Sequence, residues 1–257
     1  MRARWGLDKP LVVQYGVFLG NALKGDLGDS LKYPGSKAAD IVIERMPPTL
    51  QLAGIAMAIA VVIAVPVGVL SAIKKDSVFD YVGKTLALAG QSIPSFWLGI
   101  VLMWFFAVHL DLLPTSGKGG VKHFILPAIT LGWFQTAAIM RLVRSAMLET
   151  QDGEYVKLAR IKGLSEWKVI WKHCFRNAAI PPLTYFGILL ANTLTGSLTT
   201  EVVFNWPGTG QLAFTAVLYR DTQLIQAIVL VFASMFIFLT LLVDVLYAYL
   251  DPRIRYD

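Results

Sequence analysis

The sequence predicts an all-α protein, a polytopic bundle of transmembrane helices, and three observations support this prediction. The 257-residue chain is 56% hydrophobic and 16% charged, with a mean hydropathy of +0.60, whereas about a quarter of the residues in a soluble domain are usually charged. Its apolar residues form long runs. Its cations, which give a net charge of +6, lie between those runs, so they indicate membrane topology rather than a nucleic-acid-binding face.

Five apolar runs are long enough to cross a membrane, because the hydrocarbon core needs roughly 20 helical residues and offers no water to an open backbone. We predict spans at 50–73, 85–108, 124–147, 178–203 and 224–250. Because each proline removes a helix hydrogen bond, bends or helix ends are expected within a packed bundle, with gating hinges as the alternative. The prolines concerned are Pro66, Pro94, Pro127, Pro181 and Pro182.

The distribution of Lys and Arg predicts the orientation, since cytoplasmic loops carry more of both. They cluster at 74–84, in the long connection at 141–176 and at 253–255, whereas the opposite loops hold only Lys118, Lys122 and Arg220. We therefore expect the 150–180 loop and the 251–257 tail in the cytoplasm, and 205–221 and 1–46 outside. Because 1–46 contains no apolar run to carry it across, we expect a further helix before it in the complete protein.

The cytoplasmic loop divides into two predicted helices. Residues 154–162 contain no Gly or Pro, and Gly163 is a typical helix stop. Ser165 is the expected N-cap of a second helix, whose apolar side chains recur with a period near 3.6. That stripe consists of Trp167, Ile170, Trp171, Cys174, Phe175 and Ala178. We expect the second helix to lie in the membrane interface, and the first to be free to bind a soluble partner.

The stretch "EYVKLARIKGLSEWKVIWKHCFRNAAIPP" resembles the EAA loop of binding-protein-dependent ABC importer permeases, in the dipeptide, oligopeptide and nickel branch. Further segments with the same resemblance are "GDLGDSL", "ERMPPTLQLA", "SIPSFWLGI", "EVVFNWPGTGQL" and "DPRIRY". The "GDLG" segment resembles the first, B-type, permease of such systems. Two features depart from the general pattern: only Ala159 matches the Glu-Ala-Ala triplet, and five spans are visible where the family has six.

The resemblance implies an ABC type-1 transmembrane domain at 47–250, with a coupling loop at 150–180 and 1–46 as the rest of the first external loop. The chain has no Gly-x-x-x-x-Gly-Lys-Ser/Thr phosphate loop, so ATP and Mg are expected on partner ATPases and no cofactor on this chain. The expected partners are a second homologous permease, two ATPases, an extracytoplasmic binding protein and membrane lipid. The protein is expected to lie in the bacterial or archaeal cytoplasmic (inner) membrane.

In this family the first cytoplasmic helix docks on the ATPase, and the two permeases alternate between inward-open and outward-open states, which is called alternating access. The resemblance therefore implies that Tyr155, Leu158 and Ala159 are the docking side chains and that Gly163 makes the turn. The whole predicted set consists of Glu154, Tyr155, Leu158, Ala159, Arg160, Lys162, Gly163, Leu164 and Ser165. The implied function is peptide import without an enzymatic activity of this chain.

Polar side chains inside the spans are candidates for the translocation path. Asn192, Thr195 and Thr199 share one helical face at i, i+3 and i+7, and Gln91, Ser92, Ser95 and Gln135 are further candidates. Such residues are equally suited to interhelical hydrogen bonds. In the external "NWPGTGQL" loop, Asn205, Trp206, Gly208 and Gln211 are predicted to contact the binding protein, although a structural turn explains them too.

Other functions remain as alternatives. A nickel or other small-solute importer would use the same architecture. An ion-coupled transporter would keep ionisable residues near the midplane, and a membrane enzyme would need a catalytic motif; neither signal is evident. A non-transporting scaffold is a further alternative. One cysteine and three scattered histidines predict no metal site.

Overall fold

The computed structural model describes residues 10–250; positions 1–9 and 251–257, including the "DPRIRY" motif, lie outside the described part. Within it, regular structure is helical apart from one isolated bridge between Asp29 and Lys37. This confirms the predicted all-α class. The longer helices are α1 (Leu11–Ala22), α2 (Ala38–Ile73), α3 (Val78–Ser92), α4 (Ser95–Leu102), α5 (Lys122–Gln151), α6 (Glu154–Ile161), α9 (Ile180–Val203), α10 (Thr209–Leu218) and α11 (Thr222–Leu250).

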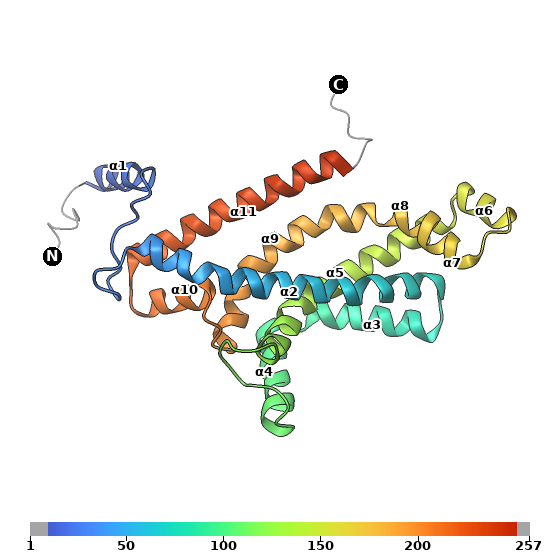
Figure 1. The fold of residues 1–257 in the computed structure, drawn as a ribbon, viewed down its shortest axis with the longest axis horizontal. Coiled ribbons are helices and arrows are strands. Elements are labelled where there is room, and N and C mark those ends of the chain that lie inside the picture. Colours follow the sequence, from blue (N-terminus) through green and yellow to red (C-terminus); the bar gives the residue numbers. More distant parts are fainter. Residues whose placement is uncertain (1–9, 251–257) are drawn as a thin grey trace.

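Helices α2, α3, α5 and α9 run along the long axis of the molecule (Figure 1), and α5 contacts the other three. Helix α11 packs on α9 and α2, while α4 and the following π-helical turn η2 (Met103–His109) project from the side. The α2–α3 turn, α6 and α7 (Glu166–Lys168) lie at one end; α1 and α10 lie at the other. The segments predicted to be cytoplasmic and external therefore occupy opposite ends.

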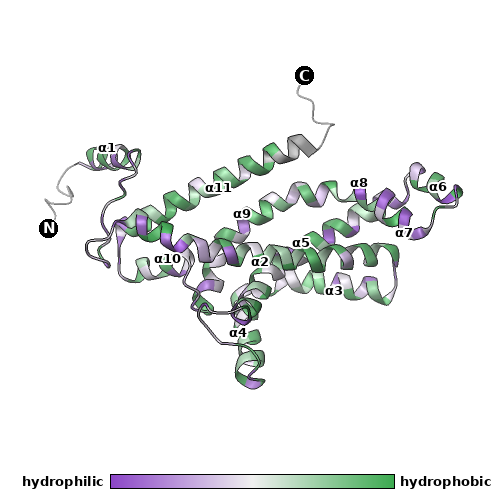
Figure 2. Ribbon diagram, in the orientation of Figure 1, coloured by the Kyte–Doolittle hydropathy of each residue, from purple (hydrophilic) through white to green (hydrophobic). Residues whose placement is uncertain are grey.

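The apolar middle of the molecule matches the predicted spans (Figure 2). By length and composition α2, α5 and α11 can each cross a membrane, and α3 with α4–η2 makes a fourth crossing if the bent pair is one span. The run at 178–203 forms α9 from position 180; its described apolar stretch, Ile180–Leu194, is shorter than a full crossing, so a span at this run stays a prediction. Helix α2 begins at Ala38, twelve residues before the predicted span at 50–73, so the expected boundary between 46 and 47 falls inside a helix.

Glycines allow α2 and α5 to pack closely. A Cβ atom at Gly132 would lie 2.7 Å from the backbone oxygen of Ala56, and one at Gly68 would lie 2.8 Å from that of Met140. Small residues let helix backbones approach each other in this way, which stabilises packing in a membrane where the hydrophobic effect between helices is weak. The α2–α5 pair is therefore the centre of the bundle.

The prolines have unequal effects. At Pro94 the chain turns by 107° between α3 and α4, whereas Pro66 and Pro127 lie inside continuous helices. Pro181 and Pro182 lie in the first turn of α9, where a missing N–H is tolerated. The predicted bend is therefore largest at Pro94.

A buried carboxylate joins three helices at the predicted cytoplasmic end. The Asp80 side chain is fully buried and accepts hydrogen bonds from Arg144 Nε at 2.6 Å and Nη2 at 2.9 Å. Ser71 on α2 donates to it at 2.6 Å, and Lys84 Nζ lies 2.9 Å away. A buried charge is stable when it is paired and fully hydrogen-bonded. This Asp80 cluster therefore joins α2, α3 and α5.

A second buried carboxylate lies at the other end. Asp221 accepts a 2.5 Å hydrogen bond from Ser30 Oγ and a 3.1 Å bond from Lys32 N, and its other oxygen receives Leu224 N at 3.1 Å. The last contact caps α11. Asp221 thus connects the "GDLGDSL" segment to the start of α11.

Candidate functional sites

Helix α6 lies outside the bundle and carries an exposed apolar row. Tyr155 is 45% exposed, Leu158 52% and Ile161 82%, and these residues follow one another at three-residue spacing on one helical face. Sequence reasoning selected Tyr155 and Leu158 but missed Ile161, although its i+3 spacing from Leu158 was a usable signal.

The opposite face of α6 packs against the chain itself. Val156 is fully buried and Ala159 is 5% exposed, in one cluster with Val169, Cys174 and Met147. Ala159 was expected to contact the partner; in this structure its side chain faces inward and that expectation is wrong. The small side chain instead permits close packing of α6 on the segment that follows it.

The turn after α6 fits its predicted role. Gly163 has φ +74°, a left-handed conformation that glycine adopts without steric cost. Gly163 N donates to Arg160 O at 2.9 Å and Leu164 N to Ala159 O at 3.3 Å, which is the bonding pattern of a Schellman motif. Lys162 is exposed just before the turn, and Leu164 is 37% exposed just after it. The end of α6 is therefore fixed by the backbone.

The second helix of the loop differs from the prediction. Ser165 occupies the predicted N-cap position of α7, but its side chain makes no cap hydrogen bond. After α7 the chain forms the π-helical segment η3 (Val169–Phe175) and then α8 (Arg176–Ala178). The wider π turn changes the register, so that Val169 and Cys174 are fully buried while Trp167 is 70% exposed. Trp171 still contacts the ring of Trp167 in a tilted arrangement and that of Phe175 edge to face.

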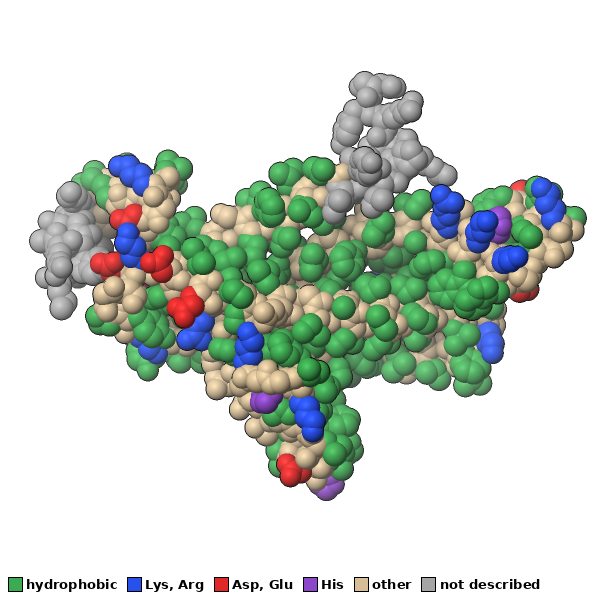
Figure 3. Space-filling view, in the orientation of Figure 1, with side chains coloured by type: hydrophobic (Ala, Val, Ile, Leu, Met, Phe, Trp, Pro, Cys, Tyr) green, Lys and Arg blue, Asp and Glu red, His purple; other side chains and the backbone are tan. Residues whose placement is uncertain are grey.

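Charged contacts surround the exposed row. Lys157 Nζ lies 2.8 Å from Glu154 Oε1 and holds the pKa of that carboxyl below its usual value. Arg160 Nε donates to Glu166 Oε1 at 3.1 Å, which spans the Gly163 turn, and Tyr155 Oη accepts from Asn177 Nδ2 at 3.2 Å. Figure 3 shows Lys and Arg side chains at this end of the molecule as well as at the opposite end. The apolar row is thus bordered by fixed charges.

The predicted translocation residues separate into two groups. Asn192 and Thr199 on α9 are exposed, and Thr199 Oγ1 lies 3.5 Å from Ser95 Oγ on α4. Gln91 is half-buried and accepts a 2.9 Å hydrogen bond from Arg141 Nη1 on α5. Ser92 is exposed, although its hydroxyl donates to Leu88 O. The side chain of Thr195 lies outside what the structure describes.

Gln135 does not belong to the exposed group. It is 5% exposed and donates to Thr193 Oγ1 at 2.9 Å inside the bundle. The alternative role for such residues, an interhelical hydrogen bond, therefore describes Gln135. Its assignment to the path was wrong.

Much of the loop at 205–221, which is predicted to be external, is buried against the bundle. Trp206 is fully buried, with Nε1 donating to Pro48 O at 3.0 Å, and Gly208 is buried. Those two residues are therefore not available for the predicted external contact, whereas Asn205 is exposed and Gln211 is half-buried. Gln211 donates to Asn205 Oδ1.

A buried carboxylate that no local sequence pattern predicted organises this loop. Glu201 is fully buried; it accepts from Thr49 Oγ1 at 2.8 Å, Gly210 N at 2.7 Å and Gln211 N at 3.1 Å. The last two donors open α10, where a negative charge is favourable. Glu201 therefore joins α2, α9 and α10.

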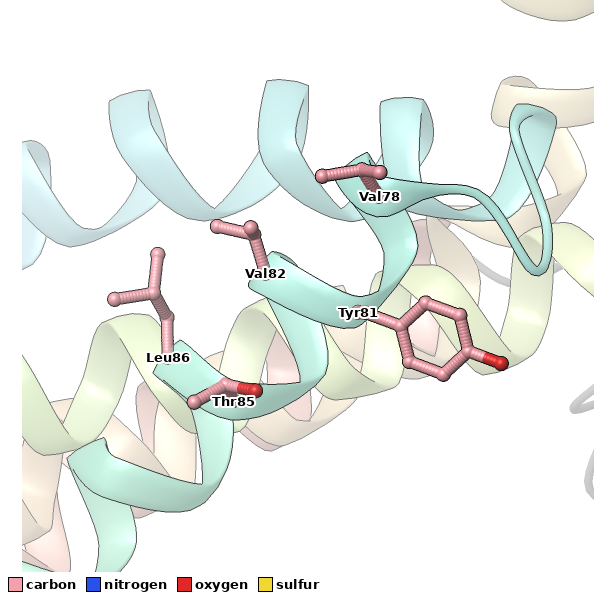
Figure 4. A pocket seen from close by; sticks show the side chains of 5 residues that line it. All are labelled: Val78, Tyr81, Val82, Thr85 and Leu86. Atoms are coloured by element: carbon pink, nitrogen blue, oxygen red, sulfur yellow. The ribbon is translucent and has the colours of Figure 1, made fainter.

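An open depression of about 320 Å³ lies along α3 (Figure 4). Its lining is formed by Val78, Tyr81, Val82, Thr85 and Leu86. These side chains offer two hydroxyl groups and no charge, which suits apolar packing better than the binding of a charged solute.

The chain matches a protein family described as the inner membrane component of binding-protein-dependent transport systems, over residues 64–256. The chain belongs to this family. Curated relatives include a dipeptide transport system permease protein of Alkalihalophilus pseudofirmus, 37% identical over 100% of this chain and 85% of the relative. A glutathione transport system permease protein of Pectobacterium atrosepticum is 43% identical, with 100% and 83% covered. The dipeptide permease of Escherichia coli K12 is 38% identical, with 99% and 84% covered.

Solved structures share the fold of this permease. Inward-facing conformations of the MetNI methionine ABC transporter match with a TM-score of 0.70 at 17% identity, over 82% of this chain and 96% of the other. An amino acid ABC transporter with histidines matches with a TM-score of 0.65 at 15% identity, over 82% and 94%. The permease therefore has the fold of an ABC importer transmembrane domain.

Proposed function

We propose that this permease moves peptides across the cytoplasmic (inner) membrane of a bacterium or archaeon. The support is that several relatives covering most of the chain are named as dipeptide, glutathione or peptide transport permeases. The proposal includes a second homologous permease, an extracytoplasmic binding protein and two ATPases that bind ATP and Mg. Movement is by alternating access.

The observation that carries the proposal is the exposed row on α6. Tyr155, Leu158 and Ile161 present apolar area at the α6 end of the molecule, where no lipid core covers them in the predicted topology. Exposed apolar patches bordered by polar residues are typical of protein interfaces. We assign this row to the ATPase.

The inward face of α6 supports a mechanical role. Val156 and Ala159 pack against Val169 and Cys174, and the Gly163 turn fixes the helix end. Movement of a docked ATPase would therefore reach α5 and α9 through packed side chains rather than through a loose loop.

The test is Leu158→Asp in the assembled transporter. We expect the ATPase to be lost on purification of the permease and peptide uptake to fall at least about tenfold, because a charge replaces a central interface side chain. Val121→Asp is the matched control: Val121 is 83% exposed at the other end, so it receives the same new charge away from α6. Normal ATPase retention and uptake in Leu158→Asp would contradict the docking assignment.

A further inference from the structure

An exposed cation lies within the fifth helix. Arg141 is on α5, inside the predicted span 124–147, and its exposed side chain shares a face with Phe134 and Ser145 at i, i+7 and i+11. It lies six residues before the end of that span, about 9 Å at the helical rise. A charge in this position is costly unless it faces water, a partner or a substrate.

The side chain of Arg141 points toward the middle of the bundle and away from the cytoplasmic end. Arg144 binds Asp80, whereas Arg141 binds Gln91, eleven residues further along α3. That separation is about 16 Å along α3, compared with about 4.5 Å between the two arginines on α5. Helical side chains lean toward the N-terminus of their own helix, which for α5 is the external end. Arg141 therefore does not reach the cytoplasmic surface as a snorkelling side chain would, although the distribution of Lys and Arg in the sequence had placed it with the cytoplasmic cations.

Among the side chains that the structure describes, which leave out Asp244 and residues 246–250, no carboxylate lies within ion-pair distance of Arg141. Its contact with Gln91 uses a neutral amide oxygen at 2.9 Å. The amide orients one side of the guanidinium. Its remaining N–H donors are left for another acceptor, and a guanidinium can bind a carboxylate through two parallel hydrogen bonds.

Groups that suit a peptide backbone lie on neighbouring helices. Ser95 lies four residues after Gln91, beyond the Pro94 bend, and its hydroxyl contacts that of Thr199 on α9. Asn192 is exposed on the same helix, two turns before Thr199. Hydroxyl and amide groups can donate to and accept from peptide groups. The cation and these neutral groups together match a molecule with one carboxylate and several amides.

We propose that Arg141 binds the C-terminal carboxylate of the peptide during translocation, with Gln91 as the positioning residue. The proposal rests on the peptide-transport function above and deepens it. It assigns the selection of a free carboxyl terminus partly to the permease, in addition to any selection by the binding protein.

The experiment measures ATP-driven uptake in proteoliposomes containing the whole transporter and its binding protein. Two peptides of the same sequence are compared, one with a free C-terminal carboxylate and one with a C-terminal amide. For each peptide, the uptake rate of a variant is divided by the uptake rate of the unmodified transporter. Any preference of the binding protein for one peptide then cancels. Lys122→Gln removes the same charge at the exposed external start of α5 and serves as the control.

We expect Arg141→Gln to lower uptake of the free-acid peptide about tenfold or more, the usual effect of losing a hydrogen-bonded charge pair. Uptake of the amide should change less than about twofold. Arg141→Lys should give an intermediate loss because an ammonium lacks the bidentate geometry. Gln91→Glu should also lower free-acid uptake, since its carboxylate would occupy Arg141.

The inference would be overturned if Arg141→Gln lowered the uptake of both peptides equally, or lowered the uptake of neither. It would also be overturned if Arg141→Gln failed to purify with the other subunits, which would identify Arg141 as an interface residue. If the unmodified transporter takes up neither peptide, the peptide function fails and the inference fails with it. If it takes up both and the Arg141 variants do not discriminate, only the inference fails.

Discussion

At the scale of single residues, the bundle depends on positions where a side chain would not fit. Gly132 faces the backbone oxygen of Ala56 on α2, so a larger residue cannot be accommodated by moving a flexible side chain. Gly54, also on α2, has no atom within 4 Å of its would-be Cβ. A larger side chain should therefore fit at Gly54 but not at Gly132.

We expect Gly132→Val to destabilise the permease by about 1–3 kcal/mol, the usual cost of overpacking. Thermal unfolding followed by size-exclusion chromatography in detergent would measure the change. Gly54→Val is the control and should leave the midpoint almost unchanged. Equal midpoints for the two variants would contradict the close approach of α2 and α5.

Single residues also show why parts of the site were not predictable. Glu201 meets Thr49 from 152 positions away, and no local periodicity encodes that contact. Trp206 lies in a loop and was predicted to be exposed, yet it packs in a buried cluster with Leu52 and Leu131, and its indole N–H donates to Pro48 O. Long-range pairing decided these two positions.

At the scale of elements, the Gly163 turn determines where α6 points. Nothing lies within 4 Å of a Cβ added at this position, so the requirement for glycine comes from the positive φ rather than from space. Non-glycine residues pay roughly 1–2 kcal/mol for the left-handed conformation, and asparagine adopts it more readily.

We therefore expect Gly163→Val to reduce peptide uptake and ATPase retention, and Gly163→Asn to retain most of both. Uptake in vesicles and co-purification of the ATPase are the measurements. Valine and asparagine have side chains of similar size, so the comparison isolates the effect of the backbone conformation at this position. Similar losses in both variants would indicate that the side chain itself matters.

The long, regular elements could be predicted from the sequence, because apolar length and cation position are local signals. The α6–Gly163–helix order is also local. The π-helical segment η3 is not, since a 3.6-residue period places Trp167 and Cys174 on one stripe, whereas the structure exposes Trp167 and buries Cys174 together with Val169. Likewise Pro94 predicted a bend, but its size of 107° depends on how α4 packs against α5 and α9.

At the scale of the whole molecule, Asp221 joins two segments at the end that is predicted to be external. This carboxylate accepts hydrogen bonds from Ser30 Oγ, Lys32 N and Leu224 N, so both of its oxygens must act as acceptors. An amide in its place would present N–H groups to donors. The segment at 23–37 would then lose its attachment to α11.

We expect Asp221→Asn to increase cleavage by trypsin at Lys32 and Lys37, because unsatisfied buried donors favour local opening. Limited proteolysis from the external side with mass spectrometry would detect it. Asp111→Asn makes the same change at an exposed position and should leave the cleavage rate unchanged. Unaltered cleavage in Asp221→Asn would show that other contacts hold the segment.

The Asp80 cluster has a consequence for the transport cycle. Because one carboxylate binds groups on α2, α3 and α5, separating these helices would leave a buried charge without partners, which is strongly disfavoured. We expect the three helices to rotate as one rigid body throughout the cycle. The change between open states would then take place along the contacts of this body with α9 and α11, and the face of α5 that carries Arg141 would move with the body rather than deform.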